Sequence, residues 1–392
     1  MTILSLFLND SIRTGGHRRF IELLSGLAFR GNRIVLLTAE SFRDSPSGVE
    51  SIPTKVSHLG GVRKARVAFA NAARSSLTML RAQVRTVDAV LVFGETNSPA
   101  ARILADAYAC PLVFGLRSNS FRVAVAMDTS ASLSTRFRAV LEAMFAFARE
   151  YRTVATADRI VFQSSYDRND FKGRFPSIAK RSGIVRNAFI EPWFSPDTAF
   201  THTLNDSKRL LFVGNTSDRK GLAYLLDALR ILNSKGESNH TLDIVGVDVQ
   251  AGSVLLKSLG FPPTSMLPGV HFLGKQEDVF KFMATSGLLI VPSVFDSYPN
   301  VILEALHVGL PILATRTGGI PDMLGENALM VPPRDAKALA EVLKLLLNDS
   351  GRYEKLRKDC SERRSHFSFD WFEAWEQEIA AAIKPDGKEV RC

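Results

Sequence analysis

Short aliphatic runs alternate with longer amphipathic segments along almost the whole chain. The runs of the first half occupy residues 3–8, 33–37, 89–93, 112–115 and 159–162, and those of the second half residues 210–213, 242–245, 271–273, 288–291, 312–314 and 329–331. Parallel strands that are covered on both faces read as aliphatic runs, and each crossover between them needs a helix. The alternation therefore predicts an α/β protein with two parallel sheets.

A polar segment separates the two sets of strands. Residues 191–197 contain two prolines, and residues 201–208 show no apolar period. A chain of 392 residues is long enough for two compact domains. We predict a first domain over residues 1–200 and a second over residues 201–366.

The end of the chain reads as one amphipathic helix over residues 367–383. Its apolar positions are Phe369, Trp371, Phe372, Trp375 and Ile379. We treat residues 367–392 as a separate C-terminal helix and tail.

The cysteines and the first apolar run indicate the compartment. Cys110, Cys360 and Cys392 are odd in number and lack metal-ligand spacing. They predict free thiols in a reducing compartment, for which the cytoplasm is the default. The apolar run at residues 3–8 is too short for a signal peptide or a membrane span.

The net charge of +9 is concentrated in the first half of the chain. Residues 1–200 carry 27 Lys and Arg against 16 Asp and Glu, whereas the remainder carries 22 against 24. Such a field favours an anionic partner, whether a lipid headgroup, a phosphorylated acceptor or nucleic acid; the alternative is a contribution to solubility alone.

A helix over residues 63–85 would carry a basic stripe with an apolar flank. Within an arc of about 100° lie Arg63, Arg66, Arg74, Arg81 and Arg85, and beside that arc lie Phe69, Leu77, Leu80 and Val84. This pattern is typical of a helix that contacts anionic lipid. The alternative is a solvated basic face whose apolar edge packs on the core.

Residues 291–309 carry the most informative candidates for a site. A strand ends near Ser293, Asp296 follows in a loop, and a helix suits Pro299 at its start and Gly309 just past its end. Asp296 would then lie at the carboxyl edge of a parallel sheet, where open α/β sheets bind ligands. Glu304 lies about 7 to 8 Å along the helix, so the two carboxylates would bracket one extended ligand. The alternative to a ligand site is that Asp296 is an ordinary loop residue and Glu304 an ordinary surface residue of the helix.

Two neighbouring loops add groups that suit an anion. Gly318 and Gly319 follow the next strand and would let backbone N–H groups approach a phosphate. Gly214 and Asn215 follow the first strand of the second domain, and Lys220 stands near the next helix as a point charge suited to a diphosphate. Taken alone, Lys220 would equally be a solvated side chain.

The first domain offers a weaker candidate loop. Thr14, Gly15 and Gly16 open the helix after the first strand without the full Gly-x-Gly-x-x-Gly pattern, so a tight turn is an equal alternative. His17 and His307 adjoin candidate loops. The sequence has no Asp-x-Asp, His-x-His or Cys-x-x-Cys pair, no Walker A loop and no Gly-x-Ser-x-Gly elbow, which argues against those metal and hydrolase chemistries.

Together these residues resemble the retaining GT-B glycosyltransferases called group 1, or glycosyltransferase family 4. The family's acidic-x7-Glu motif runs here from Asp296 to Glu304 within Pro-Ser-Val-Phe-Asp-Ser-Tyr-Pro-Asn-Val-Ile-Leu-Glu-Ala. Gly-Leu-Pro-Ile-Leu-Ala-Thr and Gly-Gly-Ile-Pro follow it, and Phe-Val-Gly precedes Lys220. The resemblance covers nearly the whole chain. It implies two Rossmann-like domains that face a central cleft, with the C-terminal helix crossing back to the first domain.

The resemblance also implies roles for single residues. Glu304 would hydrogen-bond the donor ribose, Asp296 would face the hydroxyls of the transferred sugar, and Lys220 would neutralise the departing diphosphate. The other implied donor contacts are Gly15, Gly16, Gly214, Asn215, Arg219, Ser297, Tyr298, Pro299, Asn300, Gly318 and Gly319. No metal and no cofactor besides the nucleotide-sugar substrate is implied.

The chain departs from the family pattern at three places. Asp296 stands where Glu is usual, which would shift the sugar preference. Asn215 stands where Arg is usual, and Arg219 is the candidate to replace that charge. Arg117 stands at the end of a strand where many members have His, so we take it as a candidate for acceptor or sugar contact. His17 is a second candidate, because it adjoins the Gly15-Gly16 loop.

The implied function is transfer of a sugar from a nucleotide-sugar donor to a glycan or lipid-linked acceptor, with retention of configuration, in cell-surface polysaccharide or glycolipid biosynthesis. We expect a cytoplasmic protein that uses an anionic membrane surface and no nucleic acid. Two alternatives stay open: a catalytically silent nucleotide-sugar-binding protein, which Asn215 permits, and a phosphorylase or epimerase of the same fold.

Overall fold

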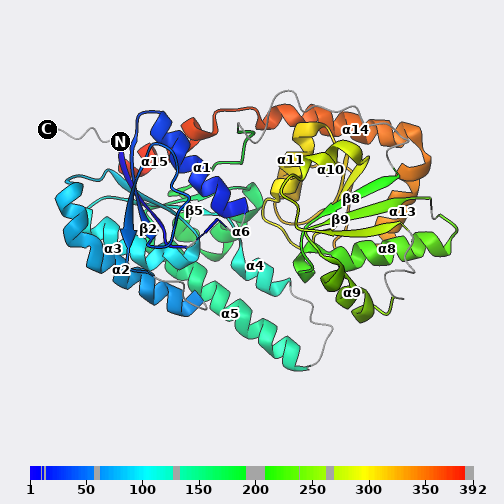
Figure 1. Ribbon diagram of the computed structural model, residues 1–392, viewed down its shortest axis with the longest axis horizontal. Coiled ribbons are helices and arrows are strands. Elements are labelled where there is room, and N and C mark those ends of the chain that lie inside the picture. The colour runs from blue at the N-terminus through cyan, green and yellow to red at the C-terminus, as the bar shows by residue number, and fades with distance from the viewer. Residues whose placement is uncertain are drawn as a thin grey trace. The chain divides into compact units, whose positions relative to one another are not determined.

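The computed structural model divides into two compact units. The first comprises residues 1–121, 142–186 and 370–392, and the second residues 122–141 and 187–369, so that two of the divisions fall inside helices. The residues that the structure describes are 1–9, 11–12, 15–56, 62–126, 133–190, 208–237, 239–261 and 269–384. Each unit is built on one parallel sheet (Figure 1).

The first sheet has seven strands in the order β3-β2-β1-β4-β5-β6-β7. Their bounds are β1 Thr2–Phe7, β2 Arg33–Ala39, β3 Val49–Thr54, β4 Ala89–Phe93, β5 Leu112–Leu116, β6 Arg159–Phe162 and β7 Ser182–Ile184. The direction of chain progress reverses between β1 and β4, which pair in parallel from Ile3 with Ala89 onwards. At such a switch point the loops after neighbouring strands diverge, which leaves room for a ligand at the carboxyl edge.

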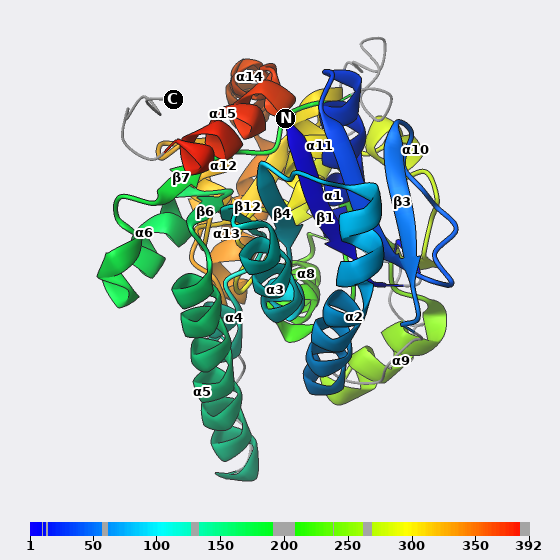
Figure 2. The same cartoon turned by 90° about the vertical axis from the view of Figure 1, so that its left-hand side faces the viewer.

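Helices cover both faces of this sheet. They are α1 Gly15–Phe29, α2 Val62–Gln83, α3 Ser98–Tyr108, α6 Ser165–Arg174 and α15 Trp371–Ile383. Two further helices, α4 Ser120–Val125 and α5 Leu133–Thr156, are each divided between the two units. The apolar sides of α2 and α3 pack into one core with alternate residues of the strands, including Leu80 and Leu104 against Leu4 and Val90. The helices α1 and α15 contact each other, and α15 also contacts β4, β5 and β6. Figure 2 shows α5 extending well beyond the strands of the first sheet.

The second sheet has six parallel strands in the order β10-β9-β8-β11-β12-β13. Their bounds are β8 Arg209–Val213, β9 Thr241–Val245, β10 Val270–Gly274, β11 Leu288–Val291, β12 Ile312–Thr315 and β13 Met330–Val331. The helices of this unit are α8 Leu222–Ser234, α9 Val249–Ser258, α10 Phe280–Thr285, α11 Asn300–Val308, α12 Ile320–Leu324, α13 Ala336–Asn348 and α14 Ser350–Arg364. The order reverses between β8 and β11, so the loops after these two strands lie at the switch point.

The predicted α/β fold with two parallel sheets is confirmed, and every expected aliphatic run overlaps a strand. The sequence reading missed β3 and β7, which are the two edge strands of the first sheet. β3 includes Pro53 and has exposed positions, and β7 has only three residues, Ser182 to Ile184. Edge strands are half exposed and need no aliphatic run, which explains why the pattern did not reveal them.

The C-terminal helix returns to the first unit, as the resemblance implied. It begins at Trp371, where the Asp370 side chain caps it by accepting from the Glu373 N–H at 2.9 Å. Trp371 and Trp375 are each only 1% exposed. The expectation that Phe369 anchors the helix is wrong, because this residue precedes the cap and is 38% exposed.

Ion pairs and ring contacts hold α15 on the first sheet. Arg30 Nε donates to Glu376 at 2.7 Å, and Arg159 Nε donates to Glu378 at 2.6 Å. The Trp375 ring lies 5.2 Å from the Phe93 ring. The helix is therefore part of the core of this unit.

The apolar flank predicted for residues 63–85 is buried in the first core. Phe69, Leu80 and Val84 are at most 6% exposed, and Leu77 packs against the same cluster. Arg74, Arg81 and Arg85 are exposed, whereas the Arg63 side chain lies outside the described part of the chain. The structure thus favours the alternative for α2: a solvated basic face with its apolar edge on the core.

Several expectations concern residues outside the described ranges. These are the boundary segment 191–207, Thr14 and Cys392. Cys110 and Cys360 are free thiols, both buried, and burial raises their pKa values to about 11 and about 12. None of the described helices combines the length and apolarity that a bilayer crossing requires.

Candidate active site

Asp296 lies in the loop between β11 and α11 and is 8% exposed. The loop ends at Pro299, which is the N-cap of α11, and the helix ends at Gly309, whose φ of 76° lies in the left-handed region. Proline, which lacks an N–H, and a left-handed glycine are the residues that such helix ends favour. The carboxylate thus lies at the carboxyl edge of the second sheet, as predicted.

Two cations converge on the Asp296 carboxylate. Lys220 Nζ lies 2.7 Å from its Oδ2 and Arg219 Nη1 lies 3.2 Å from the same atom. Both cations come from the turn Asp218–Lys220 that precedes α8. In the sequence Lys220 lies 76 residues before Asp296, and Arg219 lies 77 residues before it. Arg219 therefore brings its charge to the same place as Lys220, which supports it as the replacement for the arginine missing at Asn215.

Asn215 organises this turn through its amide oxygen. Its Oδ1 accepts from the Ser217 N–H at 3.1 Å and from the Ser217 hydroxyl at 2.5 Å. The residue is exposed and directly follows Gly214, whose N–H donates to the Val245 carbonyl at 2.9 Å. Asn215 supplies no charge here and shapes the loop that carries the two cations.

Two glycines allow the loops of the site to approach one another closely. Gly221 has a φ of 71°, and a Cβ there would lie 1.8 Å from the Pro292 carbonyl oxygen. Gly318 has a φ of 54°, and a Cβ there would lie 2.0 Å from the Asp296 carbonyl oxygen. The Gly319 N–H donates to that same oxygen at 3.1 Å. Gly319 therefore stabilises the Asp296 loop, a role that the sequence reading did not include.

The remaining predicted donor contacts line the loop and the first turn of α11. Ser297 and Tyr298 are buried, and the Tyr298 N–H donates to Asp296 Oδ1 at 3.3 Å. Asn300 Oδ1 accepts from Asn187 at 2.8 Å. Glu304 lies one helical turn beyond Asn300 and is half-buried. The structure thus brings Asp296, Lys220, Arg219, Gly318, Gly319 and the start of α11 together in one unit.

The other predicted residues lie in the first unit, except His307, which lies in the core of the second unit. Gly15 and Gly16 start α1, the helix that follows β1 in the chain. The His17 ring packs edge-on against Phe7 at 5.2 Å. In the second unit His307 is 3% exposed and its ring lies 5.0 Å from the Phe189 ring, which is a core position. The described residues contain no group of three or more His, Cys, Asp or Glu arranged to hold a metal.

The first unit has a pocket of about 470 Å³ at the carboxyl edge of β4 and β5. Its polar lining residues are Glu95, Thr96, Arg117, Ser118, Ser120, Glu142 and Arg149. Glu95 accepts from the Ser120 hydroxyl at 3.0 Å and from Arg149 Nε at 3.4 Å, and burial raises its pKa. Arg117 places its guanidinium 5.1 Å from the Phe93 ring centre.

Sequence reasoning found Arg117 in this pocket and missed Glu95 and Arg149. One signal was available: Glu95 follows β4 just as Arg117 follows β5, and neighbouring parallel strands end at the same edge. Arg149 gave no signal, because it lies in the middle of α5.

A buried acid lies beside this pocket. Glu150 of α5 is 0% exposed and accepts from the Phe121 N–H at 2.8 Å and from Arg174. Burial raises its pKa to about 7 despite the guanidinium. The Arg174 guanidinium also lies 4.4 Å from the Phe171 ring centre.

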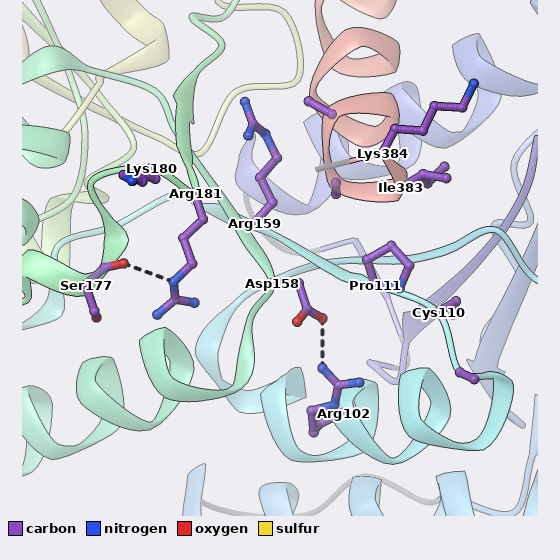
Figure 3. A pocket seen from close by; sticks show the side chains of 13 residues that line it. Arg102, Cys110, Pro111, Asp158, Arg159, Ser177, Lys180, Arg181, Ile383 and Lys384 are labelled. Atoms are coloured by element: carbon purple, nitrogen blue, oxygen red, sulfur yellow. Dashed lines mark hydrogen bonds and ion pairs between the residues drawn. The ribbon is translucent and has the colours of Figure 1, made fainter. Parts of the chain in front are cut away.

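Another pocket, of about 800 Å³, lies at the opposite, amino edge of the first sheet. Its basic residues do not converge: in Figure 3 Arg159 and Lys384 point away from Arg181. Arg102 is paired with Asp158 at 2.9 Å, and Arg181 Nε donates to the Ser177 carbonyl at 3.3 Å. We therefore take the carboxyl edge of each sheet, and not this pocket, as a candidate site.

The chain is similar to known proteins in sequence and in fold. Residues 207–349 match the family described as glycosyl transferases group 1. The lipopolysaccharide glucosyltransferase WaaG of Escherichia coli strain K12 is 24% identical over 373 residues, which cover 90% of each chain. Sucrose-phosphate synthase from Thermosynechococcus elongatus has the same fold, with a TM-score of 0.74 and 18% identity over 97% of this chain and 99% of its own. Anabaena HepE, solved in complex with UDP-glucose, gives a TM-score of 0.66 and 17% identity over 98% and 99%.

The family match lies within the second unit and includes the acidic motif and its two cations, and the likeness to these relatives spans both sheets. The chain is thus similar to the group 1 glycosyltransferases over residues 207–349 and has the GT-B fold.

Proposed function

We propose that the chain transfers a sugar from a nucleotide-sugar donor to a glycan or lipid-linked acceptor, with retention of configuration and without a metal ion. The observation that carries the proposal is the convergence of Lys220 and Arg219 on Asp296 at the carboxyl edge of the second sheet. The two cations match the negative charge of a diphosphate, and a carboxylate at this point can accept hydrogen bonds from the hydroxyl groups of a sugar. HepE, which shares the fold, has been solved with UDP-glucose.

In this proposal the cations of the turn stabilise the leaving group. The Lys220 ammonium is 18% exposed and mobile on its stem, so it moves from Asp296 to the diphosphate when donor binds. Charge develops on that diphosphate as the sugar departs, and a cation fixed nearby lowers the barrier electrostatically. Asp296 is then released to accept hydrogen bonds from the sugar, and Glu304 binds the ribose hydroxyls from α11.

The pocket of the first unit is the proposed acceptor site. Glu95 and Glu142 offer carboxylates to acceptor hydroxyls, and Arg117 and Arg149 offer guanidiniums to any phosphate on the acceptor. WaaG, which matches 90% of this chain, is by name a lipopolysaccharide glucosyltransferase. We therefore place the reaction in cell-surface polysaccharide or glycolipid biosynthesis. Cytoplasmic location fits the free thiols at Cys110 and Cys360.

The proposal is tested in two steps with the full chain. A thermal-shift panel of nucleotides and nucleotide sugars identifies the donor, because a ligand that binds only the native state raises the melting temperature. Hydrolysis of that donor is then followed without acceptor and with EDTA, and the anomeric configuration of the product is read by NMR. We expect slow, EDTA-insensitive hydrolysis with retention. Binding without turnover would instead indicate a silent sugar-binding protein, and dependence on inorganic phosphate a phosphorylase.

A further inference from the structure

Three arginines meet beside the pocket of the first unit. Arg149 and Arg152 lie one turn apart on α5, and Arg66 lies on α2, which packs against the short 3-10 helix η1 Glu95–Asn97. Arg66 is within electrostatic range of Arg149, of Arg152 and of the Glu95 carboxylate. We call Arg66, Arg149 and Arg152 the arginine cluster, and all three belong to the first unit.

The guanidinium of Arg66 is poorly satisfied by the protein. Its Nη1 is shielded from solvent and has no hydrogen-bond partner among the described residues. Burial lowers the pKa of this guanidinium, and the positive charges of Arg152 and Arg149 lower it further. An unpaired buried cation costs free energy, and like charges beside it add to that cost. A bound anion would offset both contributions.

Glu95 is the described acid that contacts the cluster, and it holds the cluster loosely. Arg149 Nε lies 3.4 Å from Glu95 Oε2, which is longer than the roughly 2.7 to 2.9 Å of a strong charge-assisted hydrogen bond. Arg152 is exposed and makes no ion pair with a described side chain. An incoming anion can therefore take over these guanidiniums without breaking a strong ion pair.

The charge balance indicates the kind of anion. The cluster and the pocket lining together hold four arginines, because Arg117 also lines the pocket, against the carboxylates of Glu95 and Glu142. Two positive charges therefore remain among these described side chains. A phosphate monoester carries about −1.5 to −2 charges at neutral pH and has three acceptor oxygens, which guanidiniums bind in bidentate pairs. A phosphate group thus matches the cluster better than a carboxylate, which carries a single charge.

We propose that the arginine cluster is a phosphate-binding site and that the acceptor entering the neighbouring pocket is a phosphorylated saccharide. Arg149 belongs both to the cluster and to the lining of the pocket of about 470 Å³. A phosphate bound by Arg149 therefore brings the saccharide attached to it into that pocket. The acceptor part rests on the proposed function, whereas phosphate binding itself does not.

Phosphate binding also releases Glu95. When Arg149 turns to the phosphate, the Glu95 carboxylate loses its guanidinium partner and keeps the hydrogen bond from the Ser120 hydroxyl. Glu95 lines the pocket, so its freed oxygen accepts a hydrogen bond from a hydroxyl group of the saccharide. Binding of the phosphate and binding of the saccharide hydroxyl thus favour each other.

The test is isothermal titration calorimetry of the full chain, without donor and at neutral pH. The probes are inorganic phosphate, the 6-phosphates of glucose, galactose and mannose, and the three free sugars. The cluster variant carries Arg66→Gln and Arg152→Gln. The matched control carries Arg74→Gln and Arg85→Gln, which removes two exposed arginines of the same unit. The phosphate titration is repeated with Lys220→Ala, which lacks a competing cation of the second unit.

We expect wild type to bind one of the sugar phosphates at least about tenfold more tightly than its free sugar, and the cluster variant to bind that sugar phosphate at least about tenfold more weakly. The control should stay within about twofold of wild type. The phosphate binding that the cluster variant loses should remain in Lys220→Ala. Equal binding by wild type and the cluster variant overturns the proposal. Sugar phosphates that all bind no more tightly than inorganic phosphate overturn its acceptor part.

Melting temperatures give a second measurement, which a purely structural role of Arg66 would not produce. Without phosphate, Arg66→Gln should melt at or above the wild-type temperature, because the substitution removes an unpaired buried cation. Phosphate should raise the melting temperature of wild type more than that of the cluster variant. A loss of several degrees by Arg66→Gln in phosphate-free buffer would show that the protein itself satisfies this guanidinium, which overturns the proposal.

Donor hydrolysis separates this inference from the proposed function. Cluster-dependent phosphate binding by a wild type that hydrolyses no nucleotide sugar would leave the phosphate site standing and the proposed function refuted. Donor hydrolysis by a wild type whose phosphate binding does not depend on the cluster refutes only the phosphate site.

Discussion

The carboxyl edges of the two sheets hold their buried acids in different ways. In the second unit Asp296 is neutralised by Lys220 and Arg219 on a loop fixed by close backbone contacts. In the first unit burial raises the pKa of Glu95 and of Glu150, although each accepts from one arginine. One architecture thus produces an edge where two cations flank a carboxylate, which suits a diphosphate, and an edge where burial raises the pKa values of its carboxyl groups.

The largest effect should come from the backbone contacts of the second edge. We expect Gly221→Ala to destabilise the protein by about 4 kcal/mol, because its Cβ would collide with the Pro292 carbonyl oxygen at 1.8 Å. Gly236→Ala is the control: its φ of 78° is also positive but nothing lies within 4 Å, so about 1 kcal/mol is expected. Urea unfolding measures both. Equal losses would show that the close approach contributes nothing.

The next effect tests the raised pKa of Glu150. Its folded pKa of about 7 exceeds the ordinary value of 4.5, so its contribution to stability is full below pH 4.5 and is lost as the pH rises through 7. We expect the free energy of unfolding of Glu150→Gln, taken relative to that of wild type, to be about 2 to 3 kcal/mol higher at pH 8 than at pH 5. Urea unfolding at the two pH values, with the exposed Glu40→Gln as control, gives the difference. If the difference in unfolding free energy between Glu150→Gln and wild type does not change with pH, the raised pKa of Glu150 does not distinguish the first edge from the second.

A smaller effect is expected on catalysis at the second edge. Lys220→Ala and Glu304→Gln should each reduce transfer at least about tenfold, equal to about 1.4 kcal/mol, while the melting temperature stays within a few degrees. Losing a charge-assisted hydrogen bond to the donor affects binding and turnover more than folding. The exposed Lys235→Ala, in the same unit, is the control. Wild-type turnover in either variant would withdraw that residue from the site.

The smallest effect should distinguish the two edges by substrate. We expect Glu95→Gln to raise the KM for acceptor about threefold and to leave donor hydrolysis unchanged, because an amide keeps one acceptor oxygen and loses the charge. Steady-state kinetics with varied acceptor, compared with Lys220→Ala, measures the contrast. A change in donor hydrolysis with no change in acceptor KM would contradict the assignment of the first pocket.

The two basic amphipathic helices of the first unit show where sequence reasoning stopped. Periodicity correctly identified α2 as a helix with a basic face and an apolar flank, yet Leu80 and Val84 of that flank are in the core. The helix with several exposed large apolar side chains is α5, which packs through Ala139, Ala146 and Val154. Periodicity reveals that a helix has two faces, but which face meets the sheet depends on the shape of the surface it must fit.

The sequence by itself determined the strands of both sheets other than β3 and β7, the ends of α11 and the position of Asp296, because these depend on residues adjacent in the chain. The tertiary structure alone decided that Lys220 and Arg219 meet Asp296 and that Glu95 meets Arg149. These contacts join residues tens of positions apart, and their geometry follows from packing of whole elements, which no local pattern encodes.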